Sequence, residues 1–144
     1  GHYYLVGNHE NYDDMSTLRV DRIAHVTVLN ERRKPLREIK GYQQQRTFNV
    51  SQYVKEHIYM FGGESITVTF KAKRSIVNQI LDWFDGNVDF TNITADNVVC
   101  RVRVNHDAFK YWALQYMQSV KVLTPASLVT EVKAAIEEGL HQYS

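Results

Sequence analysis

Apolar and polar residues alternate on both sides of a turn-rich stretch near the start of the chain. Residues 3–7 and 17–23 carry this alternation, and residues 7–16 between them are dense in Gly, Asn and Asp. Alternation with a period of two is typical of strands that bury one face, so the pattern predicts two strands joined in a hairpin. Residues 24–29 alternate in the same way and predict a third strand.

Three short strands make a sheet that is too small to stand alone, because it buries little apolar area and leaves two edges unpaired. We therefore expect the first strands to pair with strands missing from this sequence, to pair with another chain, or to pack on the second half of this chain. The chain also begins inside a strand-like pattern without an initiator Met, which favours a fragment of a longer protein.

Residues 31–40 have the composition of a linker. They contain five basic residues against two acidic ones, an excess of three positive charges, and Pro35 interrupts regular structure. Two interpretations are open: a solvated connector, or an arm that contacts phosphate groups. Residues 48–61 then predict a short helix, capped by Asn49 or Ser51, and a packed loop.

The second half of the chain has clearer patterns, because runs with a period of two alternate with runs at helical spacing. The predicted strands cover residues 65–71, 87–91, 97–105 and 120–122. The predicted helices cover residues 76–84, a segment capped by Asn105, and a segment that begins at Thr124-Pro125. The last of these helices is predicted to bury Leu128, Val132, Ile136 and Leu140.

This order of elements predicts an α+β fold. Two strand-helix-strand units give a ferredoxin-like sandwich with an extra C-terminal helix, in which both connecting helices cover one face of a four-stranded antiparallel sheet. The other face is then open, and four of the side chains predicted to point to it are basic and one is acidic. The nine residues predicted to point to the open face are Thr67, Thr69, Lys71, Asp89, Thr91, Val99, Arg101, Arg103 and Lys121.

Composition adds three constraints. With 144 residues, 44% of them apolar, the chain is long enough for one core or two small ones. The 17 Lys and Arg nearly balance the 16 Asp and Glu, so affinity for phosphates has to come from local clusters. The single cysteine, Cys100, cannot form an intramolecular disulfide and is predicted to be a buried thiol. The sequence shows no pattern of a membrane span or a signal peptide, so a reducing, cytoplasmic setting fits best.

The sequence contains no pattern that predicts catalysis. It has no nucleophile elbow, phosphate-binding loop, dinucleotide fingerprint or zinc-protease motif, and its six histidines show no ligand spacing. We therefore expect no enzyme, no cofactor and no metal.

Residues 3–23 instead suggest binding. Tyr3 and Tyr4 supply stacking surfaces, and Arg19 and Arg22 supply fixed positive charge, as a groove for a nucleotide or a nucleic acid requires. Adjacent strand residues point to opposite faces, so at most one of the tyrosines is buried. A structural ion pair between Asp21 and Arg22 is the alternative to a ligand site.

The same residues resemble a known family. Tyr3-Tyr4-Leu5-Val6-Gly7 and Leu18-Arg19-Val20-Asp21-Arg22-Ile23 resemble the Trp-Tyr-Leu hallmark and the Phe-Arg-Leu-Asp-Arg-Ile segment of the WYL domain. Four later segments resemble the C-terminal extension that follows WYL domains in bacterial transcription regulators. They are Ile66-Thr67-Val68-Thr69-Phe70, Asp85-Gly86, Trp112-Ala113-Leu114 and Val120-Lys121-Val122-Leu123-Thr124-Pro125.

The resemblance implies a domain order. Residues 1–40 would be the C-terminal part of the small Sm- or SH3-like WYL barrel, residues 41–64 a connecting segment with a short helix, and residues 65–144 the ferredoxin-like extension. A helix-turn-helix domain absent from this chain would bind operator DNA. Members commonly dimerise, so a homodimer is expected.

The resemblance also implies a ligand, which is single-stranded DNA or a nucleotide in some members. We expect Tyr3 to stack on a base, Arg19 and Arg22 to hold phosphate, and Lys71, Arg101 and Arg103 on the open sheet to extend the site. The alternative is a dimerisation or protein-interaction module with no ligand of its own.

Overall fold

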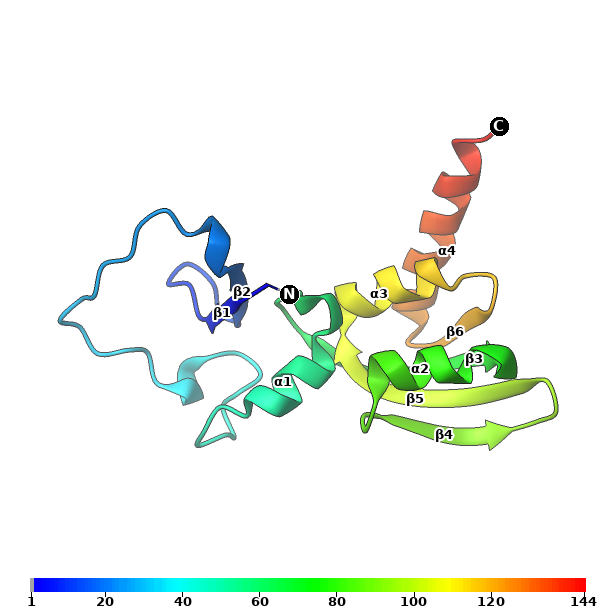
Figure 1. The fold of residues 1–144 in the computed structure, drawn as a ribbon, viewed down its shortest axis with the longest axis horizontal. Helices are drawn as coiled ribbons and strands as arrows, with labels where there is room; N and C mark the ends of the chain where they lie inside the picture. The colour runs from blue at the N-terminus through cyan, green and yellow to red at the C-terminus, as the bar shows by residue number, and fades with distance from the viewer. Residues whose placement is uncertain (1) are drawn as a thin grey trace.

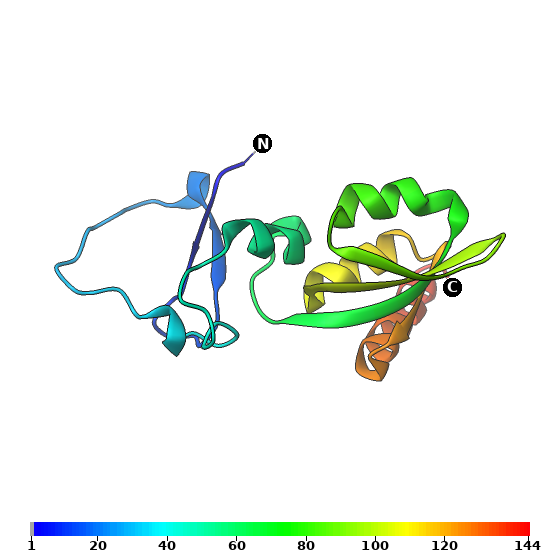
Figure 2. The ribbon, with the colours of Figure 1, turned by 90° about the horizontal axis from the view of Figure 1, so that it is seen from below.

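In the computed structural model, which describes residues 2–144, a β-hairpin with long loops lies at one end and a four-stranded sheet with its helices at the other, with helix α1 between them (Figures 1 and 2). The elements are β1 (Tyr4–Gly7), β2 (Ser16–Arg19), α1 (Val50–Glu56), β3 (Ser65–Lys73), α2 (Val77–Phe84), β4 (Val88–Ile93), β5 (Asn97–Asn105), α3 (His106–Gln115), β6 (Val120–Thr124) and α4 (Ala126–His141). Short 3-10 helices lie at Val20–Arg22 (η1), Leu36–Glu38 (η2), Ile58–Met60 (η3) and Arg74–Ile76 (η4).

The α+β class and the order of elements predicted for the second half are confirmed. The four-stranded sheet has the order β4-β5-β3-β6, and every neighbouring pair is antiparallel. Strands β3 and β5 are therefore central, as two split strand-helix-strand units produce. Within residues 2–144 no barrel closes around the hairpin, which forms a separate two-stranded sheet.

An aromatic cluster holds the two connecting helices on one face of this sheet. Phe70 from β3 contacts Phe84 from α2, and Phe109 and Trp112 from α3, with ring centroids 5.3–6.3 Å apart. All four side chains are buried, as is Cys100, and large aromatic groups contribute much of the apolar area that drives folding. The opposite face of β3 and β5 is left to solvent and to α1.

Asn105 joins the connecting segment to the sheet. Its Oδ1 accepts the backbone N–H of Ala108 (2.9 Å), which confirms the predicted cap of α3, and its Nδ2 donates to the carbonyls of Gly62 (3.0 Å) and Glu64 (3.3 Å). The residue is almost fully buried, so water cannot replace these bonds. Asn105 thereby fixes the chain entering β3 beside the end of β5.

The hairpin packs on the connecting segment. Met15, Ile39 and Tyr53 form a second buried cluster, against which Val6 and Phe48 also pack. The Tyr53 hydroxyl lies 2.8 Å from the Thr17 hydroxyl, and Asn49 caps α1, as predicted, by accepting the N–H of Gln52. The hairpin is therefore attached mainly through α1 and its flanking loops.

The third strand predicted at residues 24–29 is wrong. This segment is exposed, makes no backbone hydrogen bond, and leaves Val26 80% and Val28 92% accessible. An alternating pattern forms a strand only beside a partner, and within residues 2–144 no segment runs alongside it. The pattern identifies a surface suited to a sheet, and residues 2–144 supply no strand to pair with it.

Helix α4 also departs from the prediction. Leu128 and Val132 are buried, but Ile136 is partly exposed and Leu140 is 70% accessible, since the helix continues past the end of the sheet (Figure 1). Pro125 precedes the first helical residue rather than occupying it. Neither α4 nor any other helix within residues 2–144 is long and apolar enough to cross a membrane.

Replacing Asn105 by Ser should separate its two roles. Serine is a good N-cap, so α3 keeps its cap, while the Gly62 carbonyl loses its donor and the Glu64 carbonyl keeps only the backbone N–H of His106. We expect the free energy of unfolding to fall by about 2 kcal/mol in urea titrations, whereas Asn49→Ser, at the exposed cap of α1, should change it by less than about 0.5 kcal/mol. Equal effects would show that the two carbonyl contacts contribute nothing.

Candidate functional site

The hairpin does not bring its predicted ligand residues together. Tyr4 pairs with Arg19 across the two strands, so alternation places Tyr3 on the opposite face from Arg19. Tyr3 is 84% accessible, and its carbonyl accepts the N–H of Val20. A stacking tyrosine and a phosphate-binding arginine on opposite faces cannot hold one nucleotide together.

Arg19 is already paired. Its Nη2 and Nε bind the carboxylate of Asp21 at 2.6 and 3.1 Å, and Nη2 also lies 3.1 Å from Nδ1 of His2. The hydrogen bond from Arg19 lowers the pKa of Asp21 and raises that of Arg19 itself. The structural ion pair expected between Asp21 and Arg22 therefore forms with Arg19 instead, and Arg22 is exposed.

The open face of the sheet carries the predicted positive charge. Arg101 lies opposite Thr69 on β3 and Asp89 on β4, and Lys71 lies directly opposite Lys121 on β6. Lys71, Lys121 and Arg101 are exposed, and within residues 2–144 none of them forms an ion pair. Two lysines side by side without acidic partners favour an anion between them.

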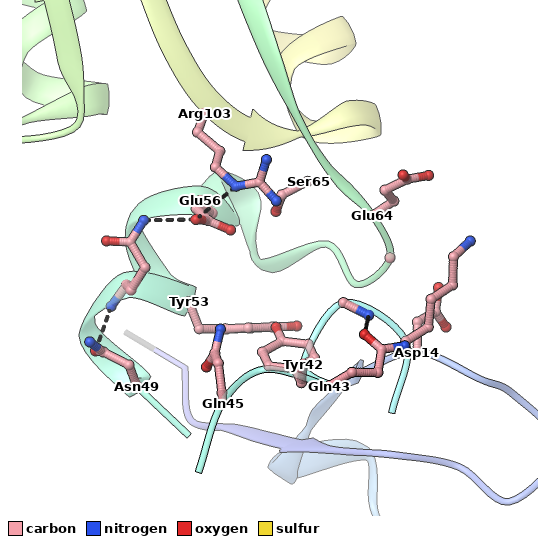
Figure 3. Close-up of a pocket in the computed structure, with 14 residues that line it drawn as sticks. Asp14, Tyr42, Gln43, Gln45, Asn49, Tyr53, Glu56, Glu64, Ser65 and Arg103 are labelled. Carbon is pink, nitrogen blue, oxygen red and sulfur yellow. Dashed lines mark hydrogen bonds and ion pairs between the residues drawn. The ribbon is translucent and has the colours of Figure 1, made fainter. Parts of the chain in front are cut away.

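A pocket of about 330 Å³ lies where the hairpin, the connecting segment and the sheet meet (Figure 3). Its lining comes from the loop after η2, from α1, and from the adjoining ends of β3 and β5. The lining residues are Asp14, Lys40, Gly41, Tyr42, Gln43, Gln45, Asn49, Gln52, Tyr53, Glu56, Gly63, Glu64, Ser65 and Arg103. Arg103 is the one predicted ligand residue among them.

Arg103 presents a free edge to this pocket. Its Nε lies 3.5 Å from Oε1 of Glu56, which also accepts a hydrogen bond from Gln52 (2.7 Å). Within the described residues the two terminal nitrogens of Arg103 have no partner, and its side chain is 56% accessible. A guanidinium held at Nε with both terminal nitrogens free can bind a carboxylate or phosphate in bidentate fashion.

Two tyrosines line the other side of the pocket. The rings of Tyr42 and Tyr53 both contact Phe48, with centroids 5.6 and 5.3 Å away. Burial raises the pKa of Tyr42 to about 12 and also raises that of Tyr53, whose hydroxyl bonds to Thr17. Both phenols therefore stay neutral and serve as hydrogen-bonding groups with apolar rings.

The pocket is mixed in charge and rich in amides. Arg103 and Lys40 face three carboxylates, and the amides of Gln43, Gln45, Asn49 and Gln52 lie between them. Such a lining suits a ligand that carries one anionic group together with donors and acceptors, and it excludes a purely apolar ligand. Sequence reasoning missed these amides, although the run of three glutamines at residues 43–45 gave a signal.

Cys100 is buried as predicted, and burial raises the pKa of its thiol to about 11, so it is not a nucleophile at neutral pH. Within residues 2–144, no group of three or more His, Cys, Asp or Glu side chains is arranged so that it could hold a metal ion; His106 contacts Asp107 and Glu131 through its two different ring nitrogens.

Comparison with known families defines the second half of the chain. Residues 63–140 match the model of the WCX domain. The match covers more than half of the chain, which belongs to the WCX domain family. WCX domains are the C-terminal extensions of WYL-domain transcription regulators, and the WYL domain itself is not detected in residues 1–62. The chain has no significant match among the curated proteins compared with it.

Stability at alkaline pH should report on the environment of Tyr42. The unfolded chain releases this proton near pH 10 and the folded protein near pH 12, so the free energy of unfolding falls as pH rises through this interval. Tyr42→Phe should lessen the fall between pH 10 and 12 in urea titrations. Phe48→Leu perturbs the same cluster without removing a titratable group and should keep the wild-type slope; an unchanged slope in Tyr42→Phe contradicts the assignment.

Proposed function

We propose that the chain is the effector-sensing and dimerisation region of a bacterial WYL-type transcription regulator, and that it binds single-stranded nucleic acid or a nucleotide-like ligand. The WCX match supports the class of regulator, and the Tyr-Tyr-Leu and Leu-Arg-Val-Asp-Arg segments resemble part of a WYL domain. In this proposal the protein acts in the cytoplasm by binding rather than catalysis, and its operator is bound by a helix-turn-helix domain outside this sequence.

The observation that carries the proposal is the free edge of Arg103 in the pocket between hairpin and extension. A phosphate on this edge places the rest of a nucleotide against Tyr42 and the amides, which can hydrogen-bond a base or a sugar. Because the pocket is built from both parts of the chain, an occupant changes how firmly they are held together. An effector site needs this property.

The open face extends the site. Arg101 lies two residues before Arg103 on β5, so the two side chains share a face, and Lys71 lies one strand away. These cations give a longer ligand a line of phosphate contacts leading away from the pocket. Tyr3, Arg19 and Arg22 stay predictions as ligand residues; none of them lines the pocket.

We also infer that the hairpin belongs to a small β-barrel whose other strands cover its outer face. This face exposes Leu5, Leu18 and Val20, and the unpaired segment adds Val26 and Val28. A soluble domain rarely leaves so many neighbouring apolar side chains in water. Further strands would bury them and give residues 24–29 a partner.

A second candidate function is dimerisation without a ligand. Ile136 and Leu140, followed by Tyr143, continue the buried stripe of α4 onto the part of the helix that projects from the domain. A second copy packing along this stripe would bury all three side chains. In this alternative the arginines of the sheet pair with acids of the partner subunit.

Binding of labelled single-stranded DNA at several salt concentrations tests the ligand. Arg103→Ala should weaken binding at least about tenfold because a bidentate charged contact is lost. Arg74→Ala, an exposed arginine on η4, is the matched control and should change affinity less than twofold.

Two results would count against the pocket. If Arg19→Ala with Arg22→Ala abolishes binding while Arg103→Ala leaves it intact, the ligand lies on the hairpin. If binding does not depend on salt, phosphate contacts do not contribute, because each one contributes a slope of about 0.7 on single strands.

Light scattering tests dimerisation. At micromolar concentration we expect twice the chain mass of 16.8 kDa, and Leu140→Glu should yield the monomer because it places a charge in the apolar stripe. Glu138→Arg, on an exposed position of the same helix, should remain dimeric. A monomeric wild-type protein removes the dimerisation function from this chain.

A further inference from the structure

A second positively charged surface lies outside the pocket and the open sheet. Residues 32–37, which we term the basic segment, include four cations. All four side chains are exposed, and within residues 2–144 none of them forms an ion pair. They are Arg32, Arg33, Lys34 and Arg37.

The backbone around the basic segment is free to follow a surface. Residues 24–34 make no backbone hydrogen bond, and Figure 1 shows this part of the chain as a wide loop directed away from α1 and the sheet. Arg32, Arg33 and Lys34 follow one another directly in this loop, so their exposed charges lie close together along the chain. The η2 turn follows at Leu36–Glu38 and carries Arg37.

The charges select the kind of partner. The whole chain has a net charge of only +1, so this concentration of cations is local and directed. Arginine forms bidentate contacts with phosphate, and three adjacent cations match a partner that repeats its negative charge along a line. A membrane surface fits less well, because η2 is a single turn and residues 23–35, which include the apolar Val26 and Val28, form no helix, so no amphipathic helix presents the cations.

We propose that the basic segment contacts the phosphodiester backbone of duplex DNA and adds sequence-independent affinity to the regulator. The inference rests on the proposed function to the extent that it places the protein at DNA. It concerns a different surface from the effector pocket and a double-stranded rather than a single-stranded partner. Phosphate contacts of this kind orient a protein on DNA without reading its sequence.

The experiment measures binding of the full chain to a labelled 20-base-pair duplex by fluorescence anisotropy at about 20 to 200 mM KCl. The test variant combines Arg32→Gln, Arg33→Gln and Lys34→Gln. Each phosphate contact adds about 0.9 to the slope of log K against log salt, so losing three should flatten it by about 2.7. The matched control, Arg74→Gln with Lys110→Gln and Lys133→Gln, removes the same net charge elsewhere and should keep the wild-type slope.

Three outcomes overturn the proposal. The first is that the wild-type chain does not bind the duplex at the lowest salt. The second is that the slope of log K against log salt flattens equally in both triple variants. The third is that the basic-segment variant loses binding to phosphatidylserine vesicles while its duplex binding stays intact. Arg103→Ala separates the two proposals. It should leave duplex binding unchanged, while the basic-segment variant should keep its affinity for single-stranded DNA in the pocket.

Discussion

The arrangement of the candidate site depends on the hydrogen bonds of one buried side chain, Asn105. Its carbonyl caps α3, and its amide holds the carbonyls of Gly62 and Glu64 beside the end of β5. These bonds add to the β3–β5 pairing and to the His106 N–H, which also binds the Glu64 carbonyl, and together they fix the start of β3 beside Arg103. Because buried polar groups are costly when unpaired, the amide and the two carbonyls constrain one another. The part of the pocket wall formed by Gly63, Glu64, Ser65 and Arg103 is therefore set by the fold of the WCX domain.

The two positively charged parts of the sheet differ in their surroundings. Arg103 shares its charge with Glu56 and lies among amides, an arrangement that favours selection by shape and hydrogen bonding. Lys71 and Arg101 face solvent without partners among the described residues, an arrangement that favours salt-dependent affinity for any phosphate. A ligand that uses both has a specific end in the pocket and a less specific part along the sheet.

The second half of the chain could be predicted from the sequence because each strand and helix buries one face within the chain itself. The limits of β5 and the Asn105 cap were correct for this reason. Residues 24–29 were mispredicted, since their alternation favours a strand but no segment of residues 2–144 pairs with them. The pocket could not be predicted either, because it arises from contacts distant in sequence. Glu56 and Arg103 are 47 positions apart, and Tyr42 gains its role only where the two parts of the chain meet.

Hydrogen exchange of the backbone amides, measured with and without a mononucleotide, is the decisive test of whether the pocket lined by Tyr42 and Arg103 is the effector site. With the mononucleotide bound, we expect slower amide exchange in residues 40–45, in α1 and in the ends of β3 and β5 around Ser65 and Arg103, because the ligand bridges these segments. Exchange in the hairpin around Tyr3 and Arg22 should not change. If the mononucleotide protects only the hairpin and leaves the pocket segments unaffected, the pocket is not the effector site.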